Sequence, residues 1–174
     1  MTFYGDCMVN KVVSNSGPII HLIEINLIQA LSIFKETYIS DEIKNELRRN
    51  SINIPKRLRL MNLRPKFKDV AEILVNKFSL DLGEAQSIAL ALQEKATYFL
   101  TDDLDARTVA NLYNIEAHGT VGIILRAFRE RIIDRKTAIK KVNELYTTSS
   151  LFITKDLITQ IIKSINDYKK SSKS

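Results

Sequence analysis

The hydrophobic pattern of this chain alternates between short runs typical of buried strands and longer stretches at helical spacing. Strand character is strongest in the runs "KVVS", "ETYIS" and "TYFLTDD", with a shorter run at "IEAHG". Helical spacing is clear in "FKDVAEILVNKF" and "LDLGEAQSIALALQEK". Strands separated by helices predict a parallel sheet with right-handed crossovers. We therefore expect a three-layer α/β domain.

Several further segments predict helices. Residues 19–31 carry apolar side chains on most of a helix surface, which predicts one largely buried helix. In "SDEIKNELRR", Ser40 is expected to cap a helix that carries acids in its first turn and arginines in its last. Residues 52–64 fit either an extended loop or a short strand. Helices are also expected at about 120–131, 136–147 and 155–168. Residues 1–130 should form the α/β domain, and residues 131–174 a helical C-terminal extension packed on it.

Composition narrows the class of protein. A chain of 174 residues with 5 glycines and 3 prolines fits one folded domain. The single cysteine, Cys7, excludes a disulfide framework or a Cys-based zinc site and fits a reducing, cytoplasmic location. No secretory signal is visible at the start. The longest apolar stretch is interrupted by His21, Glu24, Asn26 and Gln29, so no membrane span is expected.

The charge is positive and uneven. The net charge of +6 comes from 26 basic and 20 acidic residues. One basic stretch has no acid until Asp69, and a second runs from Arg126 to Lys141. Charge alone fits solvated helix faces and a polyanion-binding surface equally well. On the second interpretation, the first stretch supplies the nucleic-acid-binding residues Lys56, Arg57, Arg59, Arg64, Lys66 and Lys68.

Acidic and amide side chains fall where the ligand site of a parallel sheet is expected, at the carboxyl ends of its strands. They are Asn15 after the first strand, Glu46 on the helix after the second, Glu84 at the start of the helix before the last long strand, and Asp102, Asp103 and Asp105 after that strand. Carboxylates packed together raise one another's pKa, and a divalent cation removes that cost. Oxygen ligands without His or Cys favour Mg²⁺ or Mn²⁺.

Each of these residues also has an ordinary structural explanation. Asn15 can form a turn, Glu46 can be a solvated helix residue, Glu84 can interact with a helix dipole, and Asp103 can cap a helix. Taken together, they predict a site that holds a metal ion and cleaves phosphodiester bonds, with the basic patches holding the rest of the strand.

Five segments in order resemble PIN-domain proteins, the fold of VapC-type toxin ribonucleases and many archaeal relatives. The segments are "VVSNSGPII", "YISDEIKNEL", "LDLGEAQSIALAL", "FLTDDLDAR" and "AHGTVGIILRA". The resemblance covers about residues 11–130, and its most specific parts are the glycine-glutamate-alanine opening at Gly83 and the "TDD" segment.

The resemblance implies a PIN-like fold with Glu46, Glu84 and Asp103 as catalytic, metal-binding acids. Asp102 is a neighbouring candidate and Asp105 a supporting one. Family members typically cleave RNA with Mg²⁺ or Mn²⁺ and often form dimers, and the VapC-type toxins are paired with antitoxins. The chain is therefore expected to be a cytoplasmic, metal-dependent endoribonuclease for single-stranded RNA. A toxin role, an antitoxin protein as partner and a homodimer are further expectations from the same resemblance.

Asn15 is the departure from the family pattern, because it stands where the family has its first metal-binding aspartate. Its carbonyl oxygen can still contact a metal ion, but without a negative charge the affinity should fall. A second hypothesis is therefore a non-catalytic RNA- or protein-binding PIN module. In a third, the C-terminal helices form an interface through apolar residues that otherwise complete the core: Leu151, Phe152, Ile153, Leu157, Ile158, Ile161, Ile162 and Ile165.

Overall fold

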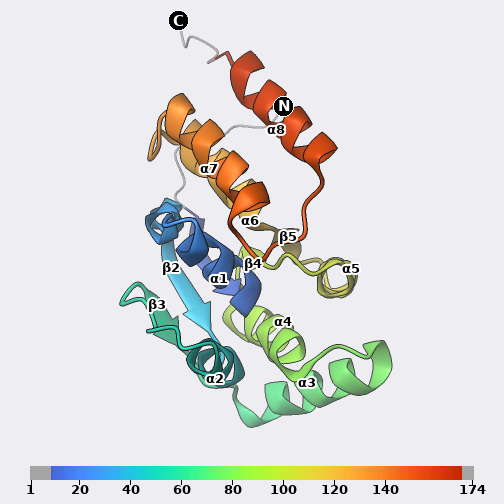
Figure 1. Ribbon diagram of the computed structural model, residues 1–174. Helices are drawn as coiled ribbons and strands as arrows, with labels where there is room; N and C mark the ends of the chain where they lie inside the picture. The colour runs from blue at the N-terminus through green and yellow to red at the C-terminus, as the bar shows by residue number, and fades with distance from the viewer. Residues whose placement is uncertain (1–8, 170–174) are drawn as a thin grey trace, which may run out of the picture.

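A five-stranded, all-parallel sheet forms the centre of the computed structural model, which describes residues 9–169 (Figure 1). Cys7 lies outside the described residues. The strand order is β3-β2-β1-β4-β5. In the central register, Val12 of β1 lies opposite Thr37 of β2 on one side and Tyr98 of β4 on the other. The strands are β1 (Val9–Ser14), β2 (Phe34–Ile39), β3 (Leu58–Leu60), β4 (Tyr98–Leu100) and β5 (Glu116–His118).

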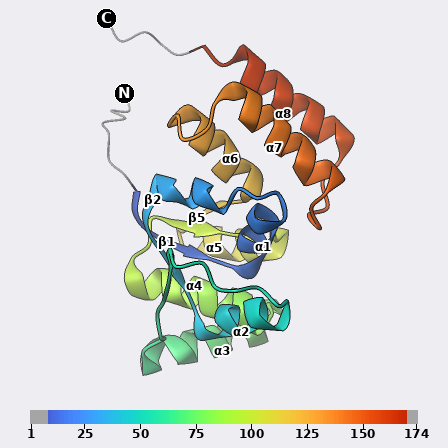
Figure 2. The ribbon, with the colours of Figure 1, turned by 60° about the vertical axis from the view of Figure 1, so that its left-hand side comes forward.

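Helices connect the strands and cover both faces of the sheet, which confirms the predicted three-layer α/β architecture (Figure 2). Because successive side chains of a strand point to opposite faces, neighbouring β1 residues belong to different cores: Val12 to one and Val13 to the other. The helices are α1 (Ser16–Glu24), α2 (Asp41–Arg49), α3 (Pro65–Phe78), α4 (Leu82–Glu94), α5 (Leu104–Leu112), α6 (Thr120–Arg129), α7 (Arg135–Thr147) and α8 (Lys155–Asp167).

The two cores draw on different helices. Residues of α1, α6, α7 and α8 pack in the core that contains Val12, whereas residues of α3, α4 and α5 pack in the core that contains Val13 and Phe99. Small side chains such as Ala85 and Ala89 let α4 lie close to the sheet. Because α1 and α4 belong to different cores, they approach the site from opposite faces of the sheet.

The last two helices are joined to the first of these cores. Val142 of α7 and Ile158, Ile161 and Ile165 of α8 are buried in the cluster that contains Val12. By contrast, Phe152, in the loop before α8, is 93% exposed. Most of the apolar residues considered for an interface thus pack inward or lie against the core, as expected of core residues.

The prediction of a single helix over residues 19–31 is wrong. The helix α1 ends at Glu24, and a 3₁₀ helix follows at Ile28–Ile33. Asn26 adopts the left-handed conformation (φ 52°), and the Leu27 N–H donates to the Leu22 carbonyl at 2.7 Å. This is a Schellman-type helix end, with asparagine in the position that glycine usually occupies. Apolar spacing continues across the break because both segments face the same core.

The uncertain segment 52–64 contains the strand β3, at one edge of the sheet. It is only three residues long and carries the exposed Arg59, two features that protect an edge strand from pairing with another chain. Across the part of the chain that the structure describes, no helix combines the length and the apolar character needed to cross a membrane.

Candidate active site

Asn15 lies directly after β1 and is the N-cap residue of α1, but its side chain does not cap the helix. Its backbone N–H donates to the Leu100 carbonyl at 2.8 Å, which places it beside the end of β4. The residue is 8% exposed, and among the described residues its Oδ1 has no hydrogen-bond partner. Buried polar oxygens are rarely left without a partner, so this oxygen is suited to a cation or a water molecule.

Glu46 lies in the second turn of α2 and is half-buried. Burial raises its pKa, against a hydrogen bond from the Ser16 hydroxyl that lowers it. On the other side, the Glu46 carboxylate lies so close to Gly83 that a Cβ at this position would collide with Oε1. Gly83 therefore leaves room for the Glu46 carboxylate, which a side chain at position 83 would force to move, and Glu46 lies between the starts of α1 and α4.

Glu84 forms a capping box with Asp81 at the start of α4. The Glu84 N–H donates to Asp81 Oδ1 at 2.7 Å, and the Asp81 N–H donates to Glu84 Oε2 at 3.1 Å. Burial raises the pKa of Glu84 to about 7 against the backbone hydrogen bond, and the carboxylates of Asp81, Asp103 and Asp105 add to the rise. Glu84 thus has the expected structural role and also lies among negative charges.

Asp103 is the N-cap residue of α5. Its Oδ1 accepts a hydrogen bond from the Ala106 N–H at 2.8 Å, and its own N–H donates to Thr101 Oγ1 at 3.2 Å. The residue is exposed. A carboxylate has two oxygens, so capping through Oδ1 leaves Oδ2 available to a ligand. The structural role expected for Asp103 is therefore compatible with a second role in the site.

We term Asn15, Glu46, Glu84 and Asp103 the acid edge. Its members are neighbours but not a closed cage: within residues 9–169 no three His, Cys, Asp or Glu side chains are grouped tightly enough to hold a metal ion. The charge of Asp103 raises the pKa of Glu84, and the charge of Asp81 raises the pKa of both Glu84 and Glu46. Glu46 lies against Gly83 and Ser16.

The chemistry of these donors fits a hard divalent cation. They are carboxylate oxygens and one unpartnered amide oxygen, with no sulfur or imidazole among them. The strongest influences on the pKa of Glu84 include three carboxylates and no cation. This surplus of negative charge around Glu84 is what a Mg²⁺ or Mn²⁺ ion would offset.

Asp102 has a different role, which the sequence did not reveal. Thr120 donates to Oδ1 through its N–H at 2.7 Å and to Oδ2 through its hydroxyl at 2.6 Å, and His21 Nδ1 lies 2.7 Å from Oδ2. Burial pushes the pKa of Asp102 upward, but the hydrogen bonds from His21 and Thr120 outweigh it and lower the pKa. Both oxygens are occupied, so Asp102 joins the end of β4 to α1 and α6 and is not a free metal ligand.

The close approach of Asp102 to α6 depends on Gly119, because a Cβ there would lie 2.7 Å from Asp102 Oδ1. We term the contacts of Asp102 with His21 and Thr120 the Asp102 latch. Its partners are 81 and 18 residues away in the sequence. The sequence signal for this contact is the glycine–threonine pair after β5, which lies within the segment "AHGTVGIILRA".

The six basic residues proposed for nucleic-acid binding differ in their surroundings. Arg59 forms an ion pair with Glu36, Nη1 to Oε1 at 3.0 Å. Arg64 donates to the Gln93 carbonyl at 3.0 Å and lies over the Phe67 ring, 5.3 Å from its centroid. The other four are exposed and form no ion pair within the described residues, and so are the more available to a polyanion: Lys56, Arg57, Lys66 and Lys68.

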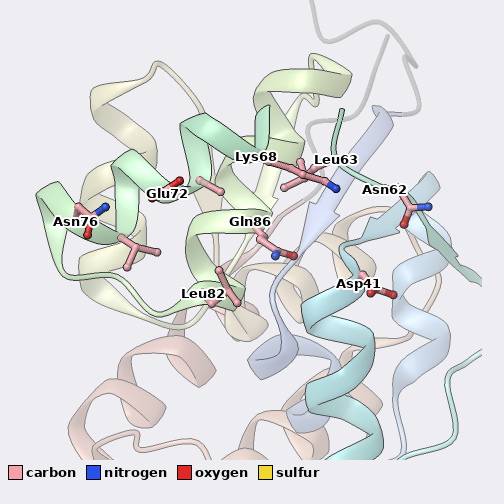
Figure 3. Close-up of a pocket in the computed structure, with 10 residues that line it drawn as sticks. Asp41, Asn62, Leu63, Lys68, Glu72, Asn76, Leu82 and Gln86 are labelled. Atoms are coloured by element: carbon pink, nitrogen blue, oxygen red, sulfur yellow. The ribbon is translucent and has the colours of Figure 1, made fainter. Parts of the chain in front are cut away.

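A cavity of about 730 Å³ lies beside the acid edge and not at it (Figure 3). Leu82 and Gln86, four residues apart on one side of α4, line it, whereas Glu84 lies between them in sequence and on another side of the helix. Lys68 is the member of the basic stretch that reaches this cavity. The full lining is Asp41, Asn62, Leu63, Lys68, Ala71, Glu72, Val75, Asn76, Leu82 and Gln86.

Comparison with known families finds a match over most of the chain. A family model described as a PIN domain matches residues 11–167, a stretch that includes α7 and α8. No curated protein matches the sequence.

Breaking the Asp102 latch should destabilise the protein. Asp102→Asn removes the charge that strengthens the contacts with His21 and Thr120, and we expect the free energy of unfolding at pH 7 to fall by about 1–3 kcal/mol. Urea titration followed by circular dichroism measures this. The exposed Asp105→Asn is the matched control and should change stability by less than about 0.5 kcal/mol. Equal stability of the two variants would show that the latch contributes nothing.

Glu84 should make stability depend on pH in the absence of metal. Its pKa is raised from 4.5 to about 7 in the folded protein, so the folded state binds more protons than the unfolded state between these values. Stability therefore falls as pH rises through this window and stays reduced above it. Glu84→Gln keeps the capping box and removes the charge, so at pH 8 it should be more stable than the parent by roughly 1–2 kcal/mol, allowing for solvent screening.

Chemical denaturation from pH 4 to pH 8.5 with a chelator present measures this difference. The control is Glu72→Gln, an exposed glutamate on α3. A Glu84→Gln variant whose advantage does not grow between pH 4.5 and pH 7 would contradict the raised pKa of Glu84.

Proposed function

This chain belongs to the PIN-domain family, and we propose that it is a metal-dependent endoribonuclease that cleaves phosphodiester bonds in single-stranded RNA. PIN domains are in general nuclease-type modules that use divalent metal ions and bind RNA. The observation that carries the proposal is the acid edge. A buried, unpartnered amide oxygen at Asn15 lies at the same sheet edge as Glu84, whose pKa is raised to about 7 by burial and by neighbouring carboxylates.

In this proposal, Glu84, Asp103 and Glu46 supply carboxylate oxygens to a Mg²⁺ or Mn²⁺ ion, and Asn15 supplies its amide oxygen. Such an ion would activate a water molecule and neutralise the negative charge that develops on the phosphate. The protein's own contribution is to hold the donors in place. The Asp102 latch fixes the start of α5 and the helix that follows Asn15, and Gly83 lets α4 approach Glu46.

A negatively charged substrate at an acidic edge needs positive charge elsewhere to bind. Lys56, Arg57, Lys66 and Lys68 offer it along β3 and the start of α3, and their exposure supports a role in holding the RNA backbone. Arg59 and Arg64 already have protein partners, so their contribution to RNA binding should be smaller.

A second candidate function is a non-catalytic RNA-binding module, and Asn15 is the observation that favours it. An amide cannot supply the negative charge that an aspartate would bring to the ion. The toxin role, the VapC-type relationship, the antitoxin partner and the homodimer rest on the sequence motifs and stay predictions.

Asn15→Asp should restore the missing charge and raise RNA cleavage. With Mn²⁺ and a single-stranded RNA, we expect the variant to cleave at least about tenfold faster than the parent chain, because one added charge near a divalent ion stabilises its binding by more than 1.4 kcal/mol. Chelator should abolish the cleavage, and adding Glu84→Gln to Asn15→Asp should reduce it to background. Denaturing gel electrophoresis of labelled RNA follows the products.

The control for the second substitution is Asn15→Asp with the exposed Glu72→Gln, which should keep full cleavage. Cleavage that survives chelator, or that survives Glu84→Gln, would overturn the proposed function. If neither the parent chain nor Asn15→Asp cleaves RNA but both bind it in a salt-dependent way, the second candidate is favoured.

A further inference from the structure

A second, smaller cavity of about 180 Å³ lies among α6, α7 and α8. Within residues 9–169, the side chains that line it are basic or aromatic: Phe128, Arg129, Arg131, Arg135 and Tyr168. No acidic residue is among them. Figures 1 and 2 show the three helices grouped on one face of the sheet.

This cavity is separate from the acid edge. The helix α6 begins at Thr120, which is bound to Asp102 near the acid edge, and ends at Arg129, which lines the cavity. At 1.5 Å per residue, a ten-residue helix places the two ends about 15 Å apart. One turn before the cavity, Arg126 lies over the rings of Phe34 and Tyr98, the first residues of β2 and β4. The cavity therefore belongs to the amino ends of the strands.

The arginines of this cavity differ in how they are bound. The Arg135 guanidinium donates to the carbonyls of Asn166 and Tyr168, the latter at 2.9 Å, and so secures the end of α8. Arg129 lies over the Tyr168 ring, 5.9 Å from its centroid. Arg131 is in the left-handed conformation (φ 63°) in the turn between α6 and α7. Within residues 9–169, neither Arg129 nor Arg131 forms an ion pair.

The acids next to these arginines in sequence have other partners. Glu130 pairs with Arg126, Oε1 to Nε at 2.6 Å, and Asp134 caps α7 by accepting from the Thr137 N–H at 2.7 Å. Neither Glu130 nor Asp134 forms an ion pair with an arginine of the cavity within residues 9–169.

Aromatic rings form the rest of the wall. Phe128 and Tyr168 pack edge to face with their centroids 5.4 Å apart, and Tyr168 is 36% exposed. Guanidinium groups bind phosphate, and an exposed ring offers a stacking surface to a planar base. A carboxylate of an acidic peptide would use the arginines but gain nothing from the ring, whereas a nucleotide uses both.

We propose that this cavity binds one nucleotide of a single-stranded RNA, with its phosphate held by Arg129 and Arg131 and its base against Tyr168. The cavity is then a second RNA-binding site that anchors the strand away from the acid edge. The inference rests on the proposed function in taking RNA as the substrate, but it does not require cleavage.

Fluorescence anisotropy with a labelled single-stranded RNA of about a dozen nucleotides tests the proposal, with chelator present so that no cleavage occurs. Arg129→Ala/Arg131→Ala should weaken binding at least about tenfold and lower the slope of log K against log salt by about 0.7, the value for one phosphate contact on a single strand. Tyr168→Ala should weaken binding about fivefold or more and leave the slope unchanged. Circular dichroism melting of each variant verifies that it is folded.

The matched control is Lys140→Ala/Lys155→Ala, which also removes two positive charges from α7 and α8 but lies outside the cavity lining. It should weaken binding less than about threefold. RNA binding that falls equally in the two double variants would overturn the proposal, because general charge would then explain it. Tighter binding of a polyglutamate peptide than of RNA, unaffected by Tyr168→Ala, would also overturn it in favour of a protein-docking site.

The outcome is distinguishable from failure of the proposed function. If the arginine variant loses RNA binding while Asn15→Asp shows no cleavage, the nucleotide site stands and the nuclease proposal fails. If Asn15→Asp cleaves RNA and Arg129→Ala/Arg131→Ala in that background binds and cleaves as before, the nuclease proposal stands and the nucleotide site fails.

Discussion

The hydrogen bonds that Asp102 makes with Thr120 and His21 fix the edge of the sheet on which the candidate site depends. Asp102 lies just after the end of β4, and its carboxylate joins the first residue of α6 to the middle of α1. Asn15 is the N-cap residue of α1, the helix that contains His21, and Asp103 follows Asp102 directly in the sequence. One largely buried acid therefore positions two members of the acid edge, and the neighbouring Gly119 leaves just enough room for it.

The acid edge itself is held against electrostatic repulsion. Two of its three acids also have a structural function: Glu84 completes a capping box and Asp103 caps α5. Burial and the nearby carboxylates still raise the pKa of Glu84 to about 7. Protonation of Glu84 therefore relieves part of the repulsion between the carboxylates. A divalent cation would relieve this repulsion instead. Asn15 reduces the repulsion further, because its side-chain oxygen carries no net charge. An amide at position 15 would thus weaken metal binding and at the same time spare the acid edge one repulsive charge.

Much of this arrangement could be predicted from the sequence, because it follows from local patterns. Short buried strand runs, the Ser40 helix start and the family motifs predict Asn15, Glu84 and Asp103 at one edge of the sheet. The break in α1 was missed because both segments bury apolar residues in the same core, and only the backbone of Asn26 departs from the helix. The Asp102 latch was missed because its partners are brought together by the tertiary fold, 81 residues apart in one case. The basic stretch could not be divided into paired and free residues, since the partners of Arg59 and Arg64 lie on other elements.

The central claim is that the acid edge binds a divalent ion with the Asn15 amide in place of a carboxylate. Calorimetric titration with Mn²⁺ in the absence of RNA tests it directly, on the parent chain, on Asn15→Asp and on Glu84→Gln. We expect saturable binding of the parent chain, binding at least about tenfold tighter for Asn15→Asp, and a marked loss for Glu84→Gln. Binding that is absent from Asn15→Asp, or identical in all three proteins, would contradict it.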